Sequence, residues 1–114
     1  MENSINGKIV YVTGGANGLG KAIVTLFCEN GADVTFCDID SAAGKKLSSE
    51  LSSYKCSYHE VDISDAAALE HSVNRVIEEK GDIDVIINNA GVIRFNSILD
   101  ITTEEIDKVL NLTS

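Results

Sequence analysis

The sequence predicts an α/β fold built on a doubly wound parallel sheet, and three observations carry this prediction. Short apolar or β-branched runs alternate with segments of helical period along the whole chain. A glycine-rich turn joins the first of these runs to the first helical segment. Strands separated by helical crossovers of this length pair in parallel. The 114 residues, 44% hydrophobic and 24% charged, fit one modest globular domain.

Four segments have the length and composition of strands, which usually run for about 5–6 residues. They are Lys8–Thr13, Asp33–Asp38, Ser57–Asp62 and Ile83–Asn88. Amphipathic helices are expected between them, because apolar residues recur there at three- and four-residue spacing. The apolar stripes are, in chain order, Leu19, Ala22, Ile23, Leu26 and Phe27; then Ala43, Leu47 and Leu51; and then Leu69, Val73, Val76 and Ile77.

The ends of the helices carry signals of their own. Ser41 and Ser64 stand where the N-caps of the second and third helices are expected. Gly31 and Gly81 follow the first and third helices, where glycine commonly ends a helix. A capping box in Thr102–Glu105 opens a fourth predicted helix, which continues to the last residues of the sequence.

The order of the strands follows from the handedness of their connections. With right-handed crossovers, two steps in one direction and a return across the first strand give the order 3-2-1-4. The direction reverses between strands 1 and 4, and ligands of such sheets bind at this switch point, at the carboxyl ends of the strands. The fourth strand would leave the apolar run Val85–Ile87 as an open edge, available for pairing.

Composition limits the partners of the protein. The sequence has 18 acidic and 9 basic residues and a net charge of −9, a field that repels nucleic acid and anionic lipid surfaces. No segment approaches the roughly 20 consecutive apolar residues of a membrane span. The first residues lack the charge and the apolar run of a signal peptide, so we expect a cytoplasmic protein.

The cysteines and histidines do not predict a metal site. Cys28, Cys37 and Cys56 form an odd set without a C-x-x-C pair, which fits neither a disulfide framework nor a zinc site. Two of them fall in apolar runs and are expected to pack as small hydrophobic residues. His59 and His71 lack clustered ligand partners and are expected at the surface or at a sheet edge.

The turn Thr13–Gly20 lies between the first strand and the first helix, the context that a phosphate-binding loop requires. Gly14 can turn the chain sharply, Gly18 lets the backbone approach a pyrophosphate, and Gly20 lets the helix pack closely on the sheet. The helix N terminus offers unpaired N–H groups to an anion, and Asn17 adds a side-chain donor. A phosphate-bearing ligand is therefore predicted here.

Asp38 closes the second strand, close to the spacing at which an acidic side chain accepts hydrogen bonds from an adenosine ribose. Its carboxylate would repel a 2′-phosphate, and neither Asn17 nor Ile39 supplies the positive charge needed to hold one. NAD is therefore favoured over NADP. The alternative for Asp38 is a solvated aspartate at a strand end, which is also what we expect of Asp40.

Two further motifs end strands at the same edge. Asp62 can accept a hydrogen bond from the exocyclic amine of an adenine, and Ile63 can pack on its ring. The run Asn88–Gly91, Asn-Asn-Ala-Gly, ends the fourth strand. Successive amides lower β-propensity and the small residues leave room for a ligand, although a plain turn would also explain part of this run.

Taken together, these motifs resemble the N-terminal half of a short-chain dehydrogenase/reductase, a family with a Rossmann-like sheet. The T-G-x-x-x-G-x-G of residues 13–20, Asp38, Asp62-Ile63 and the N-N-A-G of residues 88–91 follow in the family's order. The resemblance implies a cofactor site made of Gly14, Asn17, Gly18, Leu19, Gly20, Asp38, Asp62, Ile63, Asn89, Ala90 and Gly91. It also implies that Asn88 ties the central strands together.

The resemblance further implies hydride transfer between a nicotinamide and a hydroxyl or carbonyl substrate, with a Tyr-x-x-x-Lys motif and a Ser as catalytic residues. The sequence departs from this pattern, because Tyr11, Tyr54 and Tyr58 all precede the N-N-A-G motif and none is followed by lysine four positions later. No catalytic residue is therefore assigned. For the asparagine of the family's fourth helix, an ungapped count selects Thr113, and Asn111 would match only after a deletion.

Our leading hypothesis is that residues 1–114 are the partial NAD(P)-binding Rossmann domain of an oxidoreductase and are inactive alone. The resemblance implies a dinucleotide, a small-molecule substrate and assembly into homo-oligomers as partners. The alternative is a non-catalytic dinucleotide-binding or regulatory module. A methyltransferase that binds S-adenosylmethionine is disfavoured by the glycine spacing and the N-N-A-G motif. One loop, Val92–Asn96, does not define a substrate.

Overall fold

The computed structural model describes residues 5–89 and 100–101. Within these residues it has a parallel sheet of the order β3-β2-β1-β4-β5 and three helices. The strands are β1 (Ile9–Thr13), β2 (Asp33–Asp38), β3 (Cys56–Glu60), β4 (Val85–Asn88) and β5 (Asp100–Ile101), and the helices are α1 (Gly18–Glu29), α2 (Ser41–Glu50) and α3 (Ala66–Lys80). The predicted fold class and the order 3-2-1-4 are confirmed; the fourth helix, predicted from Thr102, lies outside the described residues.

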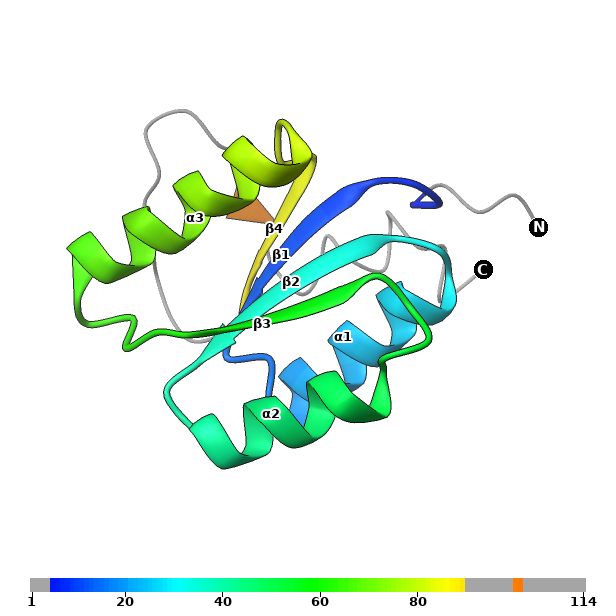
Figure 1. Ribbon diagram of the computed structural model, residues 1–114, viewed down its shortest axis with the longest axis horizontal. Helices are drawn as coiled ribbons and strands as arrows, with labels where there is room; N and C mark the ends of the chain where they lie inside the picture. The colour runs from blue at the N-terminus through cyan, green and yellow to red at the C-terminus, as the bar shows by residue number, and fades with distance from the viewer. Residues whose placement is uncertain (1–4, 90–99, 102–114) are drawn as a thin grey trace.

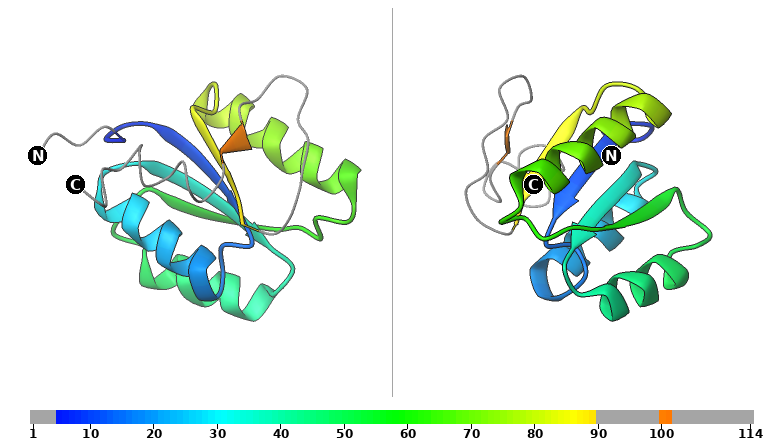
Figure 2. Two further views of the ribbon diagram at one scale, coloured as in Figure 1. Left: turned by 180° about the vertical axis from the view of Figure 1, so that it is seen from behind. Right: turned by 60° about the vertical axis from the view of Figure 1, so that its left-hand side comes forward.

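The helices form two layers on the sheet. Figure 1 and Figure 2 show α1 and α2 on one face and α3 on the other. Strand β1 lies in the middle, with Val10 level with Val34 of β2 and with Val85 of β4. Both edges of β1 are therefore paired, and the turn that follows it leaves the sheet between two neighbouring strand ends.

Each face of the sheet carries its own apolar core, because successive side chains of a strand point to opposite faces. On β1, Val10 and Val12 pack toward α1 and α2, whereas Tyr11 packs toward α3. The first core includes Val24, Phe27, Val34, Phe36, Leu47 and Ile87; the second includes Val61, Leu69, Val73, Val76 and Ile86. Full burial of one such side chain contributes about 1.5–3 kcal/mol, so these two clusters hold the helices to the sheet.

The predicted N-caps are wrong by one residue in both helices. Asp40 caps α2, with its carboxylate accepting a hydrogen bond from the Ala43 N–H at 3.1 Å, and Asp65 caps α3 in the same way. Ser41 is already the first residue of α2, while the Ser64 hydroxyl donates to the Asp62 carboxylate at 2.7 Å. Asp40 is therefore exposed, as expected, but it is also a structural cap.

The strand bounds differ from the prediction by one or two residues in three strands. Strand β1 begins at Ile9 and not at Lys8, and β3 begins at Cys56 and not at Ser57. Strand β3 ends at Glu60, two residues before the predicted end, and the Val61 N–H makes a last bond to β2, at the carbonyl of Asp38, at 3.2 Å. Strand β4 begins only at Val85. The edge of β4 that was expected to stay open is paired, because Ile86 and Ile87 lie in parallel register with the two residues of β5.

His59 is not a surface residue. It is 9% exposed, and its Nδ1 lies 2.6 Å from the Ser72 hydroxyl, which also contacts the Tyr11 hydroxyl at 2.8 Å. Burial lowers the pKa of His59 and raises that of Tyr11. This chain of polar groups links β1, β3 and α3 inside the second core. Of the two expectations for His59, a sheet edge is confirmed, because β3 is an edge strand of the described sheet, and a surface position is wrong.

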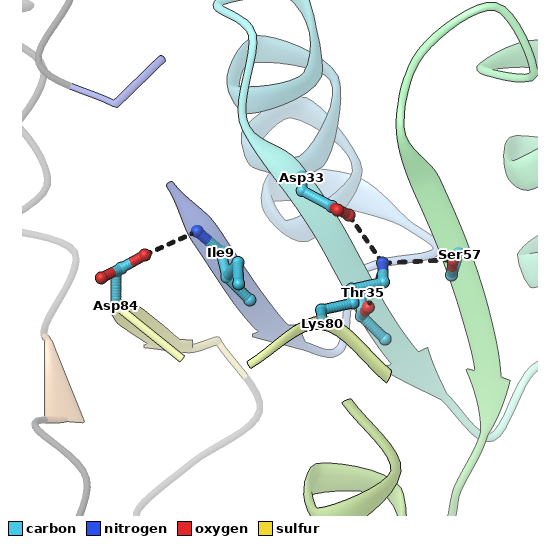
Figure 3. Close-up of polar contacts among 6 residues, drawn as sticks. All are labelled: Ile9, Asp33, Thr35, Ser57, Lys80 and Asp84. Atoms are coloured by element: carbon cyan, nitrogen blue, oxygen red, sulfur yellow. Dashed lines mark hydrogen bonds and ion pairs between the residues drawn. The ribbon is translucent and has the colours of Figure 1, made fainter. Parts of the chain in front are cut away.

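A half-buried lysine closes the amino end of the sheet (Figure 3). The ammonium of Lys80, at the end of α3, lies 2.6 Å from the carboxylate of Asp33, 3.2 Å from the hydroxyl of Thr35 and 3.4 Å from that of Ser57. Its side chain is 17% exposed. One charged group thus binds the starts of β2 and β3 to the helix on the second face.

Candidate functional site

The carboxyl ends of the strands bring the predicted site residues together at one edge of the sheet. The glycine-rich turn follows β1, Asp38 ends β2, Asp62 follows β3, and Asn89 follows β4. These segments are far apart in the sequence, and the parallel sheet alone aligns them. Ala90 and Gly91 lie outside the described residues.

The glycine-rich turn has a backbone that few other residues could adopt. Gly14 and Gly18 have φ values of 66° and 57°, in the left-handed region that favours glycine. A Cβ added to Gly18 would meet no atom within 4 Å, so this part of the turn faces open space. Gly18, where α1 begins, therefore leaves room for a group to approach the backbone.

Gly20 serves a different purpose from Gly18. A Cβ at this position would lie 1.9 Å from the carbonyl oxygen of Gly14 and 2.7 Å from the amide nitrogen of Asn89. The first turn of α1 thus packs directly on Gly14 and Asn89, the residues that follow β1 and β4. Only a glycine fits there without a shift of the backbone.

The amides that follow β4 hold this turn in place. The Asn89 side chain donates to the carbonyl of Gly14 at 3.1 Å, and the Asn89 N–H donates to the hydroxyl of Thr13 at 3.1 Å. The Thr13 hydroxyl in turn donates to the Asn88 side chain at 3.0 Å. Asn88 therefore links the ends of β1 and β4, the role that the family resemblance implies for it.

The start of α1 differs from the starts of the other two helices. Asn17 occupies its N-cap position, but its side chain makes no capping hydrogen bond, and no acidic residue lies in the first turn. Asn17 instead donates to the Asp40 carboxylate at 3.2 Å. The N–H groups at this helix end thus keep their capacity to bind an anion, in agreement with the dipole of the helix.

Asp38 is tied to the turn and to the segment that follows β2. One of its carboxylate oxygens accepts from the Ala16 N–H at 3.1 Å, and the other accepts from the Asp40 N–H at 2.9 Å. Two backbone donors therefore fix the orientation of this partly buried carboxylate beside the glycine-rich turn.

Apolar side chains surround this polar edge. Leu19 and Ile39 are 59% and 64% exposed, although both are large aliphatic residues. Ile63 is partly buried and packs against the second core. An edge with exposed apolar side chains beside a carboxylate and free N–H groups can bind a flat ring and a charged group at once.

Asp62 is exposed at the end of the β3 segment. Its carboxylate accepts hydrogen bonds from both the hydroxyl and the N–H of Ser64, and these two bonds lower its pKa. Asp62 therefore stays ionised at neutral pH and offers a hydrogen-bond acceptor at the same edge.

The family of this chain follows from its match to a known sequence model. The sequence model of the family described as short chain dehydrogenase matches residues 8–114. The chain belongs to the short-chain dehydrogenase family. Members of this family use nicotinamide dinucleotide cofactors.

Individual relatives agree with this assignment. "Short-chain dehydrogenase reductase 3b" of Arabidopsis thaliana is 38% identical over 107 residues, which cover 93% of this chain and 42% of that protein. The 3-oxoacyl-(acyl-carrier-protein) reductase FabG of Chlamydia pneumoniae is 34% identical over 118 residues, covering 100% of this chain and 48% of that protein. This short-chain dehydrogenase chain thus spans less than half the length of either relative.

A solved structure has the same arrangement. The crystal structure of a short chain dehydrogenase from Bacillus anthracis matches with a TM-score of 0.69 at 27% sequence identity, over 74% of this chain and 35% of that chain. In the described part of the short-chain dehydrogenase chain, no helix is long and apolar enough to span a membrane. In the same part, no group of three or more His, Cys, Asp or Glu side chains could hold a metal ion.

Three residues of this short-chain dehydrogenase edge were not found by sequence reasoning. A Cβ at Gly15 would lie 2.6 Å from that of Phe36, so the turn is held against β2 as well as β4. Tyr58 donates to the carbonyl of Asp38 at 2.8 Å, and Asp40 joins Asn17 to α2. The pairs Gly15–Phe36, Tyr58–Asp38 and Asp40–Asn17 are far apart in the sequence, and only the strand register could have indicated them.

Proposed function

We propose that the carboxyl edge of this sheet binds NAD, and that the site serves hydride transfer between the nicotinamide and a hydroxyl or carbonyl substrate. When bound, the nicotinamide would supply the hydride chemistry, and the protein would bind and orient the cofactor. The site is made of Gly14, Asn17, Gly18, Leu19, Gly20, Asp38, Asp62, Ile63, Asn89, Ala90 and Gly91.

The turn and the helix end support a pyrophosphate at this edge. The open space above Gly18 would admit the phosphates to the backbone, and the N–H groups at the start of α1 would donate to them. Asn89 would act through Gly14, since it fixes the carbonyl of Gly14 and thereby the direction of the turn. The chain itself thus positions the groups that a pyrophosphate would need at this edge.

The observation that carries the choice of NAD is the fixed carboxylate of Asp38. The N–H groups of Ala16 and Asp40 hold this carboxylate at the turn. Its oxygens would therefore stay in position to accept hydrogen bonds from the adenosine ribose. A ribose with free hydroxyls can donate to it, whereas a 2′-phosphate would be repelled. The neighbouring residues Asn17, Ile39 and Asp40 carry no positive charge that could compensate.

The adenine would lie between apolar and acidic groups. Asp62 would accept from its exocyclic amine, and Ile63 would pack on the ring. The exposed side chain of Ile39 lies next to Asp38 in the chain and would cover the ring from the other strand end. Burial of these exposed aliphatic groups by the ligand would contribute to its affinity.

The tyrosines of the chain do not supply the proton-transfer group of the reaction. Tyr11 is fully buried, and Tyr54 precedes β3 and so lies at the amino end of the sheet. Tyr58 bonds to the carbonyl of Asp38, and burial together with nearby acidic groups raises its pKa to about 12. We infer that these 114 residues alone would bind the cofactor without turnover; a non-catalytic dinucleotide-binding module is the alternative function.

A fluorescence titration with NADH and NADPH tests the proposal. The chain should bind NADH more tightly, and Asp38→Asn should weaken NADH binding and reduce the preference over NADPH. Asp82→Asn is the matched control, because Asp82 is exposed and precedes β4 at the other end of the sheet. Equal affinity of the wild-type chain for both dinucleotides would contradict the role of Asp38, and binding of neither would contradict the proposed function.

A second measurement separates the oxidoreductase from the binding module. A longer protein that contains these residues should oxidise an alcohol or reduce a carbonyl compound, with absorbance at 340 nm reporting NADH. Loss of that activity in the Asp38→Asn protein at low NAD, with recovery at high NAD, would support the oxidoreductase. NADH binding without turnover on any substrate of these classes would support the module instead.

A further inference from the structure

Three asparagines of the chain are followed directly by glycine, and these are Asn6, Asn17 and Asn30. Such an asparagine can lose its side-chain amide, because the backbone nitrogen of the glycine can reach the side-chain carbonyl carbon and no Cβ hinders its approach. The nitrogen must give up its proton to attack, so a hydrogen bond from the glycine N–H to a carbonyl group opposes the reaction. The bonding of each glycine N–H therefore distinguishes the three sites.

In two of the three pairs the glycine N–H is bound to a carbonyl group. The Gly7 N–H donates to the carbonyl of Gly31 at 2.9 Å, and the Gly31 N–H donates to the carbonyl of Cys28 at 3.1 Å. The side chain of Asn30 is held as well, because its amide donates to the carbonyl of Leu26 at 2.8 Å. Attack by either glycine nitrogen would first have to break one of these bonds.

The third pair, Asn17 and Gly18, lies at the start of α1, where the first N–H groups of a helix have no partner inside the helix. Within residues 5–89 and 100–101, the Gly18 N–H donates to no other group. Both residues are exposed, and a Cβ added at Gly18 would meet no atom within 4 Å. Asn17 is the N-cap residue, with an extended backbone at a φ of −138° and a ψ of 158°. This pair is thus the least constrained of the three.

We propose that Asn17 is a site of spontaneous deamidation, which converts its side-chain amide into a carboxylate at the start of α1. The Gly18 nitrogen loses its proton to a solvent base and attacks the Cγ of Asn17. An N–C bond forms, the Cγ–Nδ2 bond breaks, and the amide nitrogen takes up a proton and leaves as ammonia. Water then opens the cyclic imide at either carbonyl and gives aspartate or isoaspartate, and neither an oxidant nor a reductant takes part.

The new carboxylate would change two interactions of this side chain. The amide of Asn17 donates to the Asp40 carboxylate at 3.2 Å, a bond that a second carboxylate cannot make, and the two like charges would repel each other. As an aspartate at an N-cap, the side chain would instead accept from N–H groups of the first turn of α1, as Asp40 and Asp65 do in their own helices. The proposed function assigns these N–H groups to the pyrophosphate, so the consequence for the cofactor rests on that proposal.

Peptide mapping of the full chain, incubated at neutral pH and sampled over time, tests the modification without any substitution. Trypsin places the three asparagines in separate peptides, of residues 1–8, 9–21 and 22–45, and fragmentation locates the change within each. Asn17 should convert about fivefold faster than the other two, because a net hydrogen bond of ordinary strength corresponds to a factor of about this size. A rate at Asn17 no higher than at either of the others would overturn the proposal.

The same mapping in urea shows whether the fold causes the difference. In the unfolded chain all three glycine N–H groups are solvated, so the rates at the three asparagines should converge. If Asn17 were modified as selectively in urea as in the folded chain, its local sequence would be the cause and the structural argument would be wrong.

Asn17→Asp reproduces the aspartate product and separates a blocked site from a damaged one. Its free energy of unfolding should stay close to that of the wild-type chain, because aspartate and asparagine are comparable N-caps, whereas its affinity for NADH should fall several-fold. Asn6→Asp is the matched control, since it makes the same change before β1, at the amino end of the sheet, and should preserve NADH affinity.

The titration also keeps the two proposals apart. Wild-type NADH affinity in Asn17→Asp would contradict the blocking role of the carboxylate. Failure of the unmodified wild-type chain to bind NADH would contradict the proposed function alone, because the peptide mapping decides the modification at Asn17 independently.

Discussion

The side-chain amide of Asn89 donates a hydrogen bond to the carbonyl oxygen of Gly14 at 3.1 Å, so the end of β4 holds the turn that follows β1. The two groups are brought together by the parallel register that pairs Thr13 with Asn88. The first turn of α1 packs on both of them, since a Cβ added at Gly20 would collide with the same two groups. The geometry of the turn thus depends on three segments and not on its glycines alone.

Gly20→Ala should therefore disturb both folding and cofactor binding. The new methyl group would meet the carbonyl of Gly14, and we expect a loss of about 1–3 kcal/mol in the free energy of unfolding. NADH affinity should fall with it, because the turn must move. Gly7→Ala is the control: it adds a methyl group in open space at a φ of 78°, and should cost stability only. Wild-type stability and affinity in Gly20→Ala would contradict this packing.

The N-cap assignments can be tested with pairs of adjacent residues. Asp40→Ala and Asp65→Ala should each lower the free energy of unfolding by about 1 kcal/mol, because each removes the acceptor for an N–H of the first helical turn. Ser41→Ala should change it by less than about 0.5 kcal/mol. Urea denaturation followed by circular dichroism measures all three. A larger effect at Ser41 than at Asp40 would restore the sequence-based assignment.

His59 should make stability depend on pH in the weakly acidic range. Burial and the nearby charge of Arg75 hold its pKa in the folded chain below the value of 6.5 that it has when unfolded. The unfolded chain therefore binds the proton more readily, so stability is complete above pH 6.5 and decreases as the pH falls below it. His59→Gln should reduce this dependence, while His71→Gln, at an exposed site on α3, should preserve it. Thermal unfolding between pH 7.5 and 5 provides the comparison.

The ion pairs of Lys80 and Arg75 should contribute very differently to the free energy of unfolding. Lys80→Met removes a half-buried cation from Asp33 and two hydroxyls, and should cost about 1–3 kcal/mol. Arg75→Met breaks a pair with Glu79 that is about half exposed, at 3.7 Å, and should cost at most about 0.5 kcal/mol. Chemical denaturation of the two variants in parallel tests the difference. Similar losses of unfolding free energy in both would show that burial does not determine the contribution of the Lys80 pair.

The sequence predicted the fold well because local patterns determine it. Short apolar runs such as Val10–Val12 and helical stripes such as the one through Phe27 are recognised within a few residues, and the crossover rule then orders the strands. The Asp38 prediction for the ribose rests on a fixed distance from a glycine-rich turn. The position of Asp38 at the end of the second strand can therefore be identified from the sequence. The role of Asp38 in binding the ribose stays a prediction.

What the sequence could not show depends on contacts between distant residues or on backbone angles. Asp and Ser are equally good caps, and only the extended backbone of Asp40 identifies it as the residue outside α2. His59 looked like a lone surface histidine because its partner Ser72 lies on another element.

Strand β3 directs side chains of different chemical character to the two sides of the sheet. Cys56 and Tyr58 face the core of α1 and α2, while His59 faces the core of α3. Protonation of His59 would thus weaken the packing of α3, whereas the core of α1 and α2 lies on the other side of the pleated backbone from the imidazole. Acidity should therefore affect the two helical layers of the chain unequally.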